Sequence, residues 1–285
     1  MKFKNEDQFK YFMKKSSKEL GITIPHVYTT YFSRTLLERL AYLNYGAFVT
    51  KGSFSQYVHM NKLLRPVTDI DLASETTFDE SLLPLFDKIN DNDEDIKYTI
   101  VNARRTKTNM LKLSVNGTIG KIIMPVKIDF DENNNRIFEV QYKPVVPIFT
   151  GDEKFYINTP SFEEHLAEKL CIIAESNKED VINTRVKDFY DIYEMHGDKY
   201  DRDKFSIYFE RMIKERKKID INNLSTLHLN KNFVESHQDT WENISKKYEF
   251  LDKNIDLDEA VYYTRAVLSE QLQNIRQNRK VYTKK

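Results

Sequence analysis

The chain has 285 residues with 44 basic and 44 acidic side chains, so no overall field attracts nucleic acid and any RNA contact must use local basic patches. Its single cysteine, Cys171, excludes an internal disulfide and fits a reducing compartment. No apolar run approaches the roughly 20 residues of a membrane span, and the first residues lack the apolar core of a signal peptide. We therefore expect a cytoplasmic protein without a membrane contact.

The first half of the sequence predicts a mixture of helices and strands. A helix is expected over residues 5–20, and a second one begins near Pro25, with apolar residues at helical spacing. The further elements expected in chain order are a strand at 47–50, a helix at 53–60, a strand at 69–72, a helix at 79–89, and strands at 97–102, 110–115, 121–130 and 156–158. Asn116-Gly117 predicts a hairpin turn, and the segment from Pro144 to Pro147 predicts a connector.

Strand patterns stop near residue 159, and the second half predicts only helices. The expected helices cover residues 161–176, 184–196, 201–217, 239–250 and 257–278. Asp256 and Glu259 indicate the first turn of the last helix, because carboxylates favour the positive end of a helix dipole. We therefore expect an α+β protein with two lobes, an α/β lobe over residues 1–158 that includes the N-terminal helices and an all-helical lobe over residues 159–285.

Two carboxylates dominate the predicted strand near residue 70. Asp69 and Asp71 lie two residues apart and so point to one face, which leaves Ile70 and the following leucine for the other. Adjacent carboxylates repel each other unless a cation lies between them, and Mg²⁺ is the usual cation for oxygen ligands beside phosphate. The preceding Gly52-Ser53 turn offers backbone N–H groups and a hydroxyl that suit a triphosphate. Taken alone, an Asp-x-Asp pair is also typical of a solvated strand end.

A third carboxylate follows in another strand-like run. Alternation over residues 126–131 puts Lys127, Asp129 and Asp131 on one face. Asp129 lies inside the apolar run, whereas Asp131 opens a polar loop and is predicted to be a turn residue. Because two-metal phosphoryl transfer needs about three carboxylates, the pattern predicts a nucleotidyl-transfer site with two Mg²⁺ ions.

The helical half contains a second group of polar residues. Lys169 lies beside an apolar stripe, and Asp188 and Asp191 lie three residues apart on one helical face. One interpretation is a solvated face with an ion pair between Arg185 and Asp188. The other is that Lys169 reaches nucleotide phosphates and is held by a carboxylate of the next helix. The residues alone leave both interpretations open.

These motifs, taken in order, resemble those of a known family. The matching blocks are residues 37–40, 48–53, 65–72, 127–129, 168–170 and 185–192. In this order they resemble the AbiEii/AbiGii nucleotidyltransferase toxins of type IV toxin–antitoxin and abortive-infection systems, which include the MenT toxins. The resemblance covers about residues 20–195 and implies a polymerase-β-like lobe, a mixed sheet with flanking helices. The last ninety residues carry no matching motif.

The resemblance implies a role for each matched residue of the first lobe. Gly52 and Ser53 correspond to the phosphate-holding turn. Asp69 and Asp71 correspond to the catalytic metal-binding pair, and Asp129 corresponds to the third carboxylate that binds metal. These five residues would form the nucleotide and metal part of the site.

The resemblance also covers the second lobe, with some departures. Lys169 corresponds to the catalytic, nucleotide-contacting lysine and Asp191 to the essential aspartate of the last motif, with Asp188 as a possible partner. Val67 stands where the family usually has Ser or Thr, and Ser53 stands where a second glycine is common. The departure at Val67 removes any hydroxyl-dependent role there, but the metal-ligand positions are intact.

The implied reaction is transfer of a nucleoside monophosphate from GTP, CTP or UTP to a hydroxyl, with release of pyrophosphate. The family suggests the 3′ end of tRNA as the acceptor, which would block aminoacylation and translation and serve phage defence. A cognate antitoxin encoded nearby would act without a stable complex. The alternatives are a small-molecule nucleotidyltransferase, a protein-modifying nucleotidyltransferase, and a GTP-binding module without turnover.

RNA binding would need local basic patches, of which the sequence has three. They are Arg104, Arg105 and Lys107; Arg211, Lys214, Arg216, Lys217 and Lys218; and Arg276, Arg279, Lys280, Lys284 and Lys285. Each patch is also typical of a solvated face or tail, so the sequence does not select among them.

Overall fold

The computed structural model describes most of the chain in ten segments. They are residues 3–43, 48–74, 82–90, 95–107, 110–132, 138–175, 186–197, 200–216, 224–247 and 255–282. The chain divides into two compact units, of which the first comprises Met1–Pro160 and the second begins at Ser161. The first unit contains all the strands described below, and the second contains helices.

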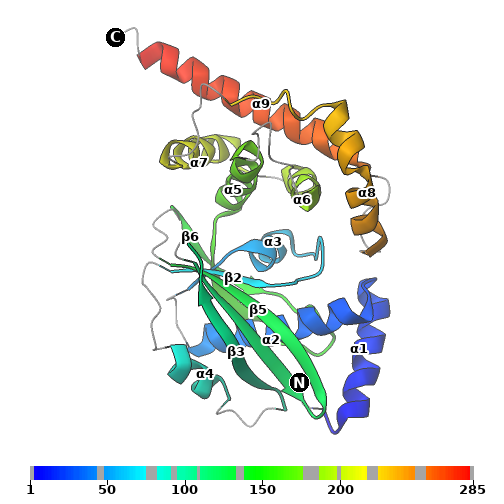
Figure 1. The fold of residues 1–285 in the computed structure, drawn as a ribbon. Helices are drawn as coiled ribbons and strands as arrows, with labels where there is room; N and C mark the ends of the chain where they lie inside the picture. The colour runs from blue at the N-terminus through cyan, green and yellow to red at the C-terminus, as the bar shows by residue number, and fades with distance from the viewer. Residues whose placement is uncertain are drawn as a thin grey trace. The chain divides into compact units, whose positions relative to one another are not determined.

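A mixed sheet of seven strands forms the centre of the first unit (Figure 1). The strands are β1 (Val49–Thr50), β2 (Ile70–Ser74), β3 (Lys97–Arg105), β4 (Met110–Ile119), β5 (Ile122–Glu132), β6 (Val140–Val145) and β7 (Phe155–Pro160). Their order across the sheet is β3-β4-β5-β2-β1-β7-β6. The β2–β5 and β1–β7 pairs are parallel, and all other neighbours are antiparallel. The predicted α+β class with a mixed sheet is confirmed.

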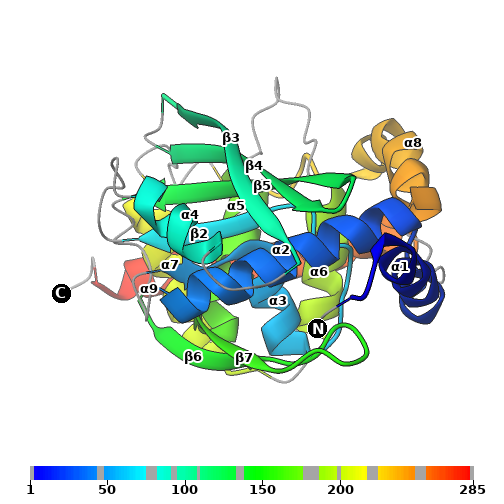
Figure 2. The same cartoon turned by 90° about the horizontal axis from the view of Figure 1, so that it is seen from below.

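Four helices lie in the described part of the first unit. They are α1 (Glu6–Leu20), α2 (Ile24–Leu43), α3 (Gly52–Met60) and α4 (Leu82–Asn90). Asn5 caps α1 by accepting a hydrogen bond from Gln8 N at 2.9 Å, and Gly21 ends it with a φ of 63°. The long helix α2 runs across the sheet in both views, with α1 beside it (Figures 1 and 2).

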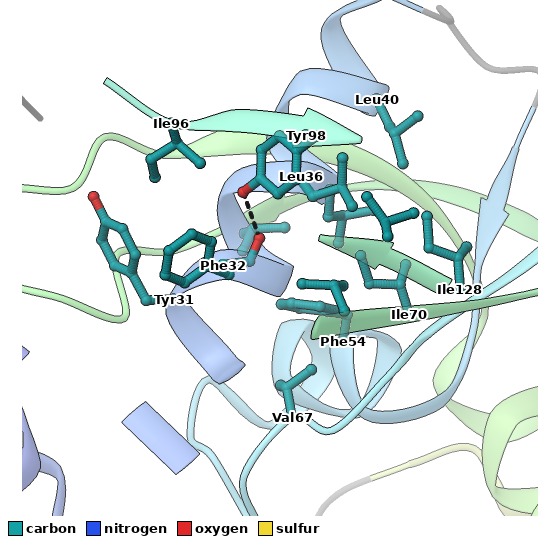
Figure 3. Close-up of a cluster of buried hydrophobic side chains, with 14 of the residues drawn as sticks. Tyr31, Phe32, Leu36, Leu40, Phe54, Val67, Ile70, Ile96, Tyr98 and Ile128 are labelled. Carbon is teal, nitrogen blue, oxygen red and sulfur yellow. Dashed lines mark hydrogen bonds between the residues drawn. The ribbon is translucent and has the colours of Figure 1, made fainter. Parts of the chain in front are cut away.

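The core of this unit lies between α2 and one face of the sheet (Figure 3). Leu36 and Leu40 of α2 pack with Ile70 and Ile128 of the two central parallel strands, and all four side chains are buried. The Tyr98 hydroxyl, also in this core, donates a hydrogen bond of 2.8 Å to the backbone oxygen of Phe32 in α2. Because strand side chains alternate, residues next to Ile70 and Ile128 in sequence point to the opposite face.

The predicted hairpin turn at Asn116-Gly117 is wrong. Both residues lie inside β4, and the turn to β5 is made by Gly120 and Lys121, with Gly120 at a φ of +56°. Gly117 serves packing instead, because a Cβ atom there would lie 2.3 Å from Cδ1 of Phe32. A close approach of backbone to an aromatic ring and a tight turn both require glycine, so the dipeptide alone does not distinguish them.

Three other predictions need correction. Asp131 is not a turn residue, since it lies in β5, where it pairs with β2 and β4. Pro144 lies in β6 rather than in a connector, which is possible because β6 is an edge strand and proline need not donate there. The helix expected from residue 239 begins at Lys231, because Asn230 caps it by accepting from Phe233 N at 3.2 Å. The predicted starts at residues 47, 79 and 184 lie outside the described residues.

Five helices make up the described part of the second unit. They are α5 (Phe162–Glu175), α6 (Val186–His196), α7 (Arg202–Glu215), α8 (Lys231–Lys247) and α9 (Leu257–Tyr282). The long helix α9 packs along the others, and α5 packs on α7. The carboxylate of Asp256 accepts from Glu259 N at 2.7 Å, which confirms the predicted first turn of α9. Cys171 is fully buried in α5, and burial raises the pKa of its thiol, so it is structural. In the part of the chain that the structure describes, no helix combines the length and apolarity of a membrane span.

Candidate functional site

The turn between β1 and α3 is packed against a carboxylate of β2. Gly52 has a φ of +60°, and a Cβ atom at this position would lie 1.9 Å from Oδ2 of Asp71. The backbone is tied at the same point, because Lys51 N donates a hydrogen bond of 2.8 Å to the backbone oxygen of Asp71. Glycine is therefore required here twice, once for the left-handed conformation and once for contact with the carboxylate.

The N-terminus of α3 has the features of an anion site. Lys51 is its N-cap residue and makes no side-chain capping hydrogen bond. The hydroxyl oxygen of Ser53 is buried and has no hydrogen-bond partner among the described residues. Free backbone N–H groups at a helix start carry partial positive charge, and a buried hydroxyl without a partner is costly. A phosphate group at this position would satisfy both.

The three predicted carboxylates lie on the two central parallel strands. Asp69 immediately precedes β2, Asp71 lies within it, and Asp129 of β5 is the residue directly paired with Asp71. Ile70 and Leu72 are buried, which confirms that the aspartates and the apolar residues alternate between faces. The structure thus brings together the Gly52 turn and the strand carboxylates, which lie far apart in the sequence.

Electrostatic repulsion among these carboxylates is strong. Burial, and after it the charges of Asp69 and Asp129, raise the pKa of Asp71 to about 6. Arg65 and Lys51 oppose the shift but do not cancel it. A concentration of negative charge that neighbouring cations leave uncompensated is the setting in which a divalent cation binds oxygen ligands.

The third carboxylate already has a cationic partner. Lys112 of β4 is paired directly with Asp129 of β5, and their side chains form an ion pair. Among the described residues, no three His, Cys, Asp or Glu side chains are gathered closely enough to hold a metal ion. Asp129 would therefore have to exchange Lys112 for a metal before it could join Asp69 and Asp71 around a cation. The sequence patterns had not indicated Lys112, although its alternation with Leu111 and Leu113 marks it as a residue of the polar face.

In the helical unit, Lys169 and the two carboxylates form one cluster. Lys169 Nζ of α5 lies 2.7 Å from Asp191 Oδ2 and 3.5 Å from Asp188 Oδ1, both on α6. The lysine side chain is 7% exposed and both aspartates are 0% exposed. The interpretation of a solvated face is therefore wrong, and the lysine is held by carboxylates of the next helix. Arg185, the alternative partner of Asp188, lies outside the described residues.

A comparison with protein-family models shows which family the chain belongs to. The family model described as "Nucleotidyl transferase AbiEii toxin, Type IV TA system" matches residues 37–262. The chain belongs to the AbiEii family. This confirms the resemblance found in the sequence motifs, and it makes the chain a nucleotidyltransferase of a toxin family. The match also extends about seventy residues beyond the last recognised motif, into the helices α7, α8 and the start of α9.

Three solved structures that match this AbiEii chain have low sequence identity to it. JHP933 from Helicobacter pylori is 12% identical, with a TM-score of 0.45, over 92% of this chain and 98% of that one. A candidate nucleotidyltransferase from H. pylori is 14% identical, with a TM-score of 0.42, over 86% and 93%. An antigenic nucleotidyltransferase-like protein from Paracoccidioides brasiliensis is 12% identical, with a TM-score of 0.36, over 67% and 88%. No curated protein matches the sequence.

Proposed function

We propose that this AbiEii-family chain binds a nucleoside triphosphate with Mg²⁺ and transfers the nucleoside monophosphate to a hydroxyl of RNA, at the 3′ end of tRNA. The observation that carries the proposal is the contact between Gly52 and the Asp71 carboxylate. In this contact, the N-terminus of α3, which suits phosphate, lies against a carboxylate that suits a cation. A nucleotide bound as its magnesium complex needs a phosphate site and a cation site next to each other.

In the proposed reaction, the acceptor oxygen attacks the α-phosphorus, the bond to the β-phosphate breaks, and pyrophosphate leaves. The N–H groups at the start of α3 and the Ser53 hydroxyl hold the leaving phosphates. Asp69 and Asp71 would hold Mg²⁺, and Asp129 would join them as a ligand once it is released from Lys112. Bound Mg²⁺ supplies charge neutralisation and makes the acceptor hydroxyl more acidic. The protein mainly positions the reactants, so few side chains need to take part in the chemical step.

We assign the buried cluster of the helical unit to the same reaction. Lys169 would supply positive charge to the nucleotide phosphates, and Asp191 and Asp188 would keep its ammonium group in one position. The support is the 2.7 Å contact between Lys169 and Asp191, because a lysine held at full burial presents its charge with little loss of side-chain entropy.

The biological role follows from the acceptor. Nucleotides added to the tRNA 3′ end would prevent aminoacylation and stop translation in the cytoplasm, which suits abortive infection after phage attack. The type IV family implies a cognate antitoxin. We propose that this antitoxin opposes the activity without forming a stable complex.

The decisive test uses purified protein with Mg²⁺, each α-labelled nucleoside triphosphate in turn, and total bacterial tRNA, followed by a denaturing gel. We expect label to move with tRNA for one or two nucleotides, and to be absent with Asp69→Ala or without Mg²⁺. Asp87→Ala, an exposed aspartate of α4, is the matched control and should retain transfer. Nucleotide binding without label on RNA would overturn the RNA acceptor and favour a small-molecule or protein acceptor, or a GTP-binding module.

A further inference from the structure

Four charged residues form one line across the sheet. Asp71 of β2 is paired with Asp129 of β5, Asp129 with Lys112 of β4, and Lys112 with Arg104 of β3. Directly paired residues share a face, so the two carboxylates are followed by two cations on the same side. With about 4.8 Å between neighbouring strands, the line extends roughly 14 Å from Asp71 to Arg104.

A third cation lies on this face. Lys127 precedes Asp129 by two residues on β5, and it is exposed, whereas Val126 and Ile128 on either side of it are fully buried. Neither Lys127 nor Arg104 forms an ion pair with any described residue. Lys112 is tied to Asp129, but an ammonium group has three N–H donors and keeps two for other partners. We call Arg104, Lys112 and Lys127 the cation surface.

Three other basic side chains singled out in the sequence form ion pairs. Arg105, next to Arg104, points to the opposite face and forms an ion pair with Glu132. In the helical unit, Lys214 pairs with Glu210 and Arg216 pairs with Glu175. Four more basic residues lie outside the described residues, namely Lys217, Lys218, Lys284 and Lys285. The side chains of Arg279 and Lys280 are also not described. Unlike these three side chains, Arg104 and Lys127 of the cation surface form no ion pair with a described residue.

The order of the strands separates two binding regions. The phosphate-type turn at Gly52 follows β1, which lies on one side of β2 in the sheet. The cation surface lies on β5, β4 and β3, which continue from the other side of β2. Asp71 and Asp129 lie between the two regions. Phosphates of the donor nucleotide and a second polyanion could therefore be held at the same time without competing for the same groups.

We infer that the cation surface binds the phosphate backbone of a nucleic-acid acceptor and directs its terminal hydroxyl toward Asp129. The chain has no net charge, so a local group of unpaired cations must supply the attraction to a polyanion. A protein or small-molecule acceptor would not require a line of cations that leads away from the carboxylates. This inference rests on the proposed function, because it names the surface that would bind the RNA acceptor of that site.

The test is binding of total bacterial tRNA, measured by filter retention at several KCl concentrations, for wild type and Arg104→Glu/Lys127→Glu. We expect the double variant to bind at least about tenfold more weakly, with the slope of log affinity against log salt less steep by roughly 1.4–1.8, the value for two phosphate contacts. Binding of the labelled nucleotide with Mg²⁺ should be unchanged. The control is Lys14→Glu/Lys15→Glu, which makes the same charge change on exposed residues of α1 and should bind tRNA like wild type.

The outcomes distinguish the inference from the proposed function. An unchanged tRNA affinity and salt slope in the double variant, or an equal loss in the α1 control, overturns the inference even if label is transferred to RNA. A selective loss in the double variant supports the cation surface even if wild type transfers nothing to RNA, a result that would overturn the proposed function instead.

Discussion

At position 52, residue identity is decided by contact rather than by local conformation alone. Gly120 and Gly52 have nearly the same backbone conformation, with φ values of +56° and +60°. A Cβ atom at Gly120 would meet only the flexible end of Glu6, at 2.9 Å, whereas one at Gly52 would overlap the Asp71 carboxylate. The two glycines therefore provide a matched pair, one structural and one at the site.

We predict that Gly52→Ala lowers nucleotidyl transfer by at least about 100-fold, because the added methyl group displaces Asp71 and a 1 Å misplacement costs that much. Gly120→Ala should lose about 1 kcal/mol of folding stability from backbone strain and retain transfer. Transfer of labelled nucleotide and thermal unfolding, measured on both variants, check this. Equal activities in the two variants would show that the contact at Gly52 does not matter.

Asp71 also predicts a pH dependence of stability in the absence of divalent ions. Its pKa is raised from 3.8 to about 6, so the folded protein binds the proton more tightly than the unfolded chain. The contribution of Asp71 to the free energy of unfolding is fully present below pH 3.8 and is lost as pH rises through 6. The total loss is at most about 3 kcal/mol. Asp71→Asn should therefore raise the melting temperature at pH 7.5 but not near pH 4. Asp87→Asn, on the surface of α4, should show no such difference.

At the scale of elements, the pairing of α5 with α6 depends on a buried charge cluster. Lys169 reaches from α5 to Asp188 and Asp191 of α6, and all three side chains are almost fully buried. Removal of one member of a buried ion pair leaves the remaining charge in a poorly solvating interior. The cluster is therefore part of the fold of the helical unit as well as a candidate part of the site.

We predict that Lys169→Met lowers the free energy of unfolding by about 3 kcal/mol, because it removes the ammonium group between two buried carboxylates. Urea unfolding monitored by far-UV circular dichroism measures the loss. Lys231→Met, at an exposed ion pair of α8, is the control and should change stability by less than about 0.5 kcal/mol. If both variants unfold at the same urea concentration, the cluster does not stabilise the helical unit.

On the scale of the whole molecule, charge balances in total but not in space. The 44 basic and 44 acidic side chains cancel, yet carboxylates and unpaired cations are placed next to each other on one face of the sheet. The helical unit contains a cluster of aromatic rings around His196. His196 of α6 packs with Tyr200, Phe205 and Tyr263, and its Nδ1 lies 2.5 Å from the Tyr263 hydroxyl.

This aromatic packing predicts acid sensitivity of the folded protein. Burial lowers the pKa of His196 from 6.5 to about 4, so the folded state holds the neutral imidazole while the unfolded chain takes up a proton. The stability from this group is complete above pH 6.5 and is lost as pH falls toward 4. His196→Phe should make the melting temperature of the protein less dependent on pH between pH 6.5 and 4. An unchanged curve would mean that His196 is exposed to solvent in the folded protein.

Local patterns in the sequence predicted most of the elements and named candidate site residues. The alternation around Asp71 and Asp129 predicted which side chains share a face, since the strand period is a property of consecutive residues. The motif spacing led to the AbiEii family, which the family match confirmed. The roles of the individual residues stay predictions until they are measured.

The sequence by itself determined the type of most elements and the family, because these depend on neighbours in the chain. Only the tertiary structure decided that Gly117 is needed for packing, that Lys112 pairs with Asp129, and that Arg104 continues the same line whereas Arg105 does not. The physical reason is strand register. A shift of one residue between strands would exchange the faces of all their side chains, and register is fixed by packing of the whole sheet against α2, which no short stretch of sequence encodes.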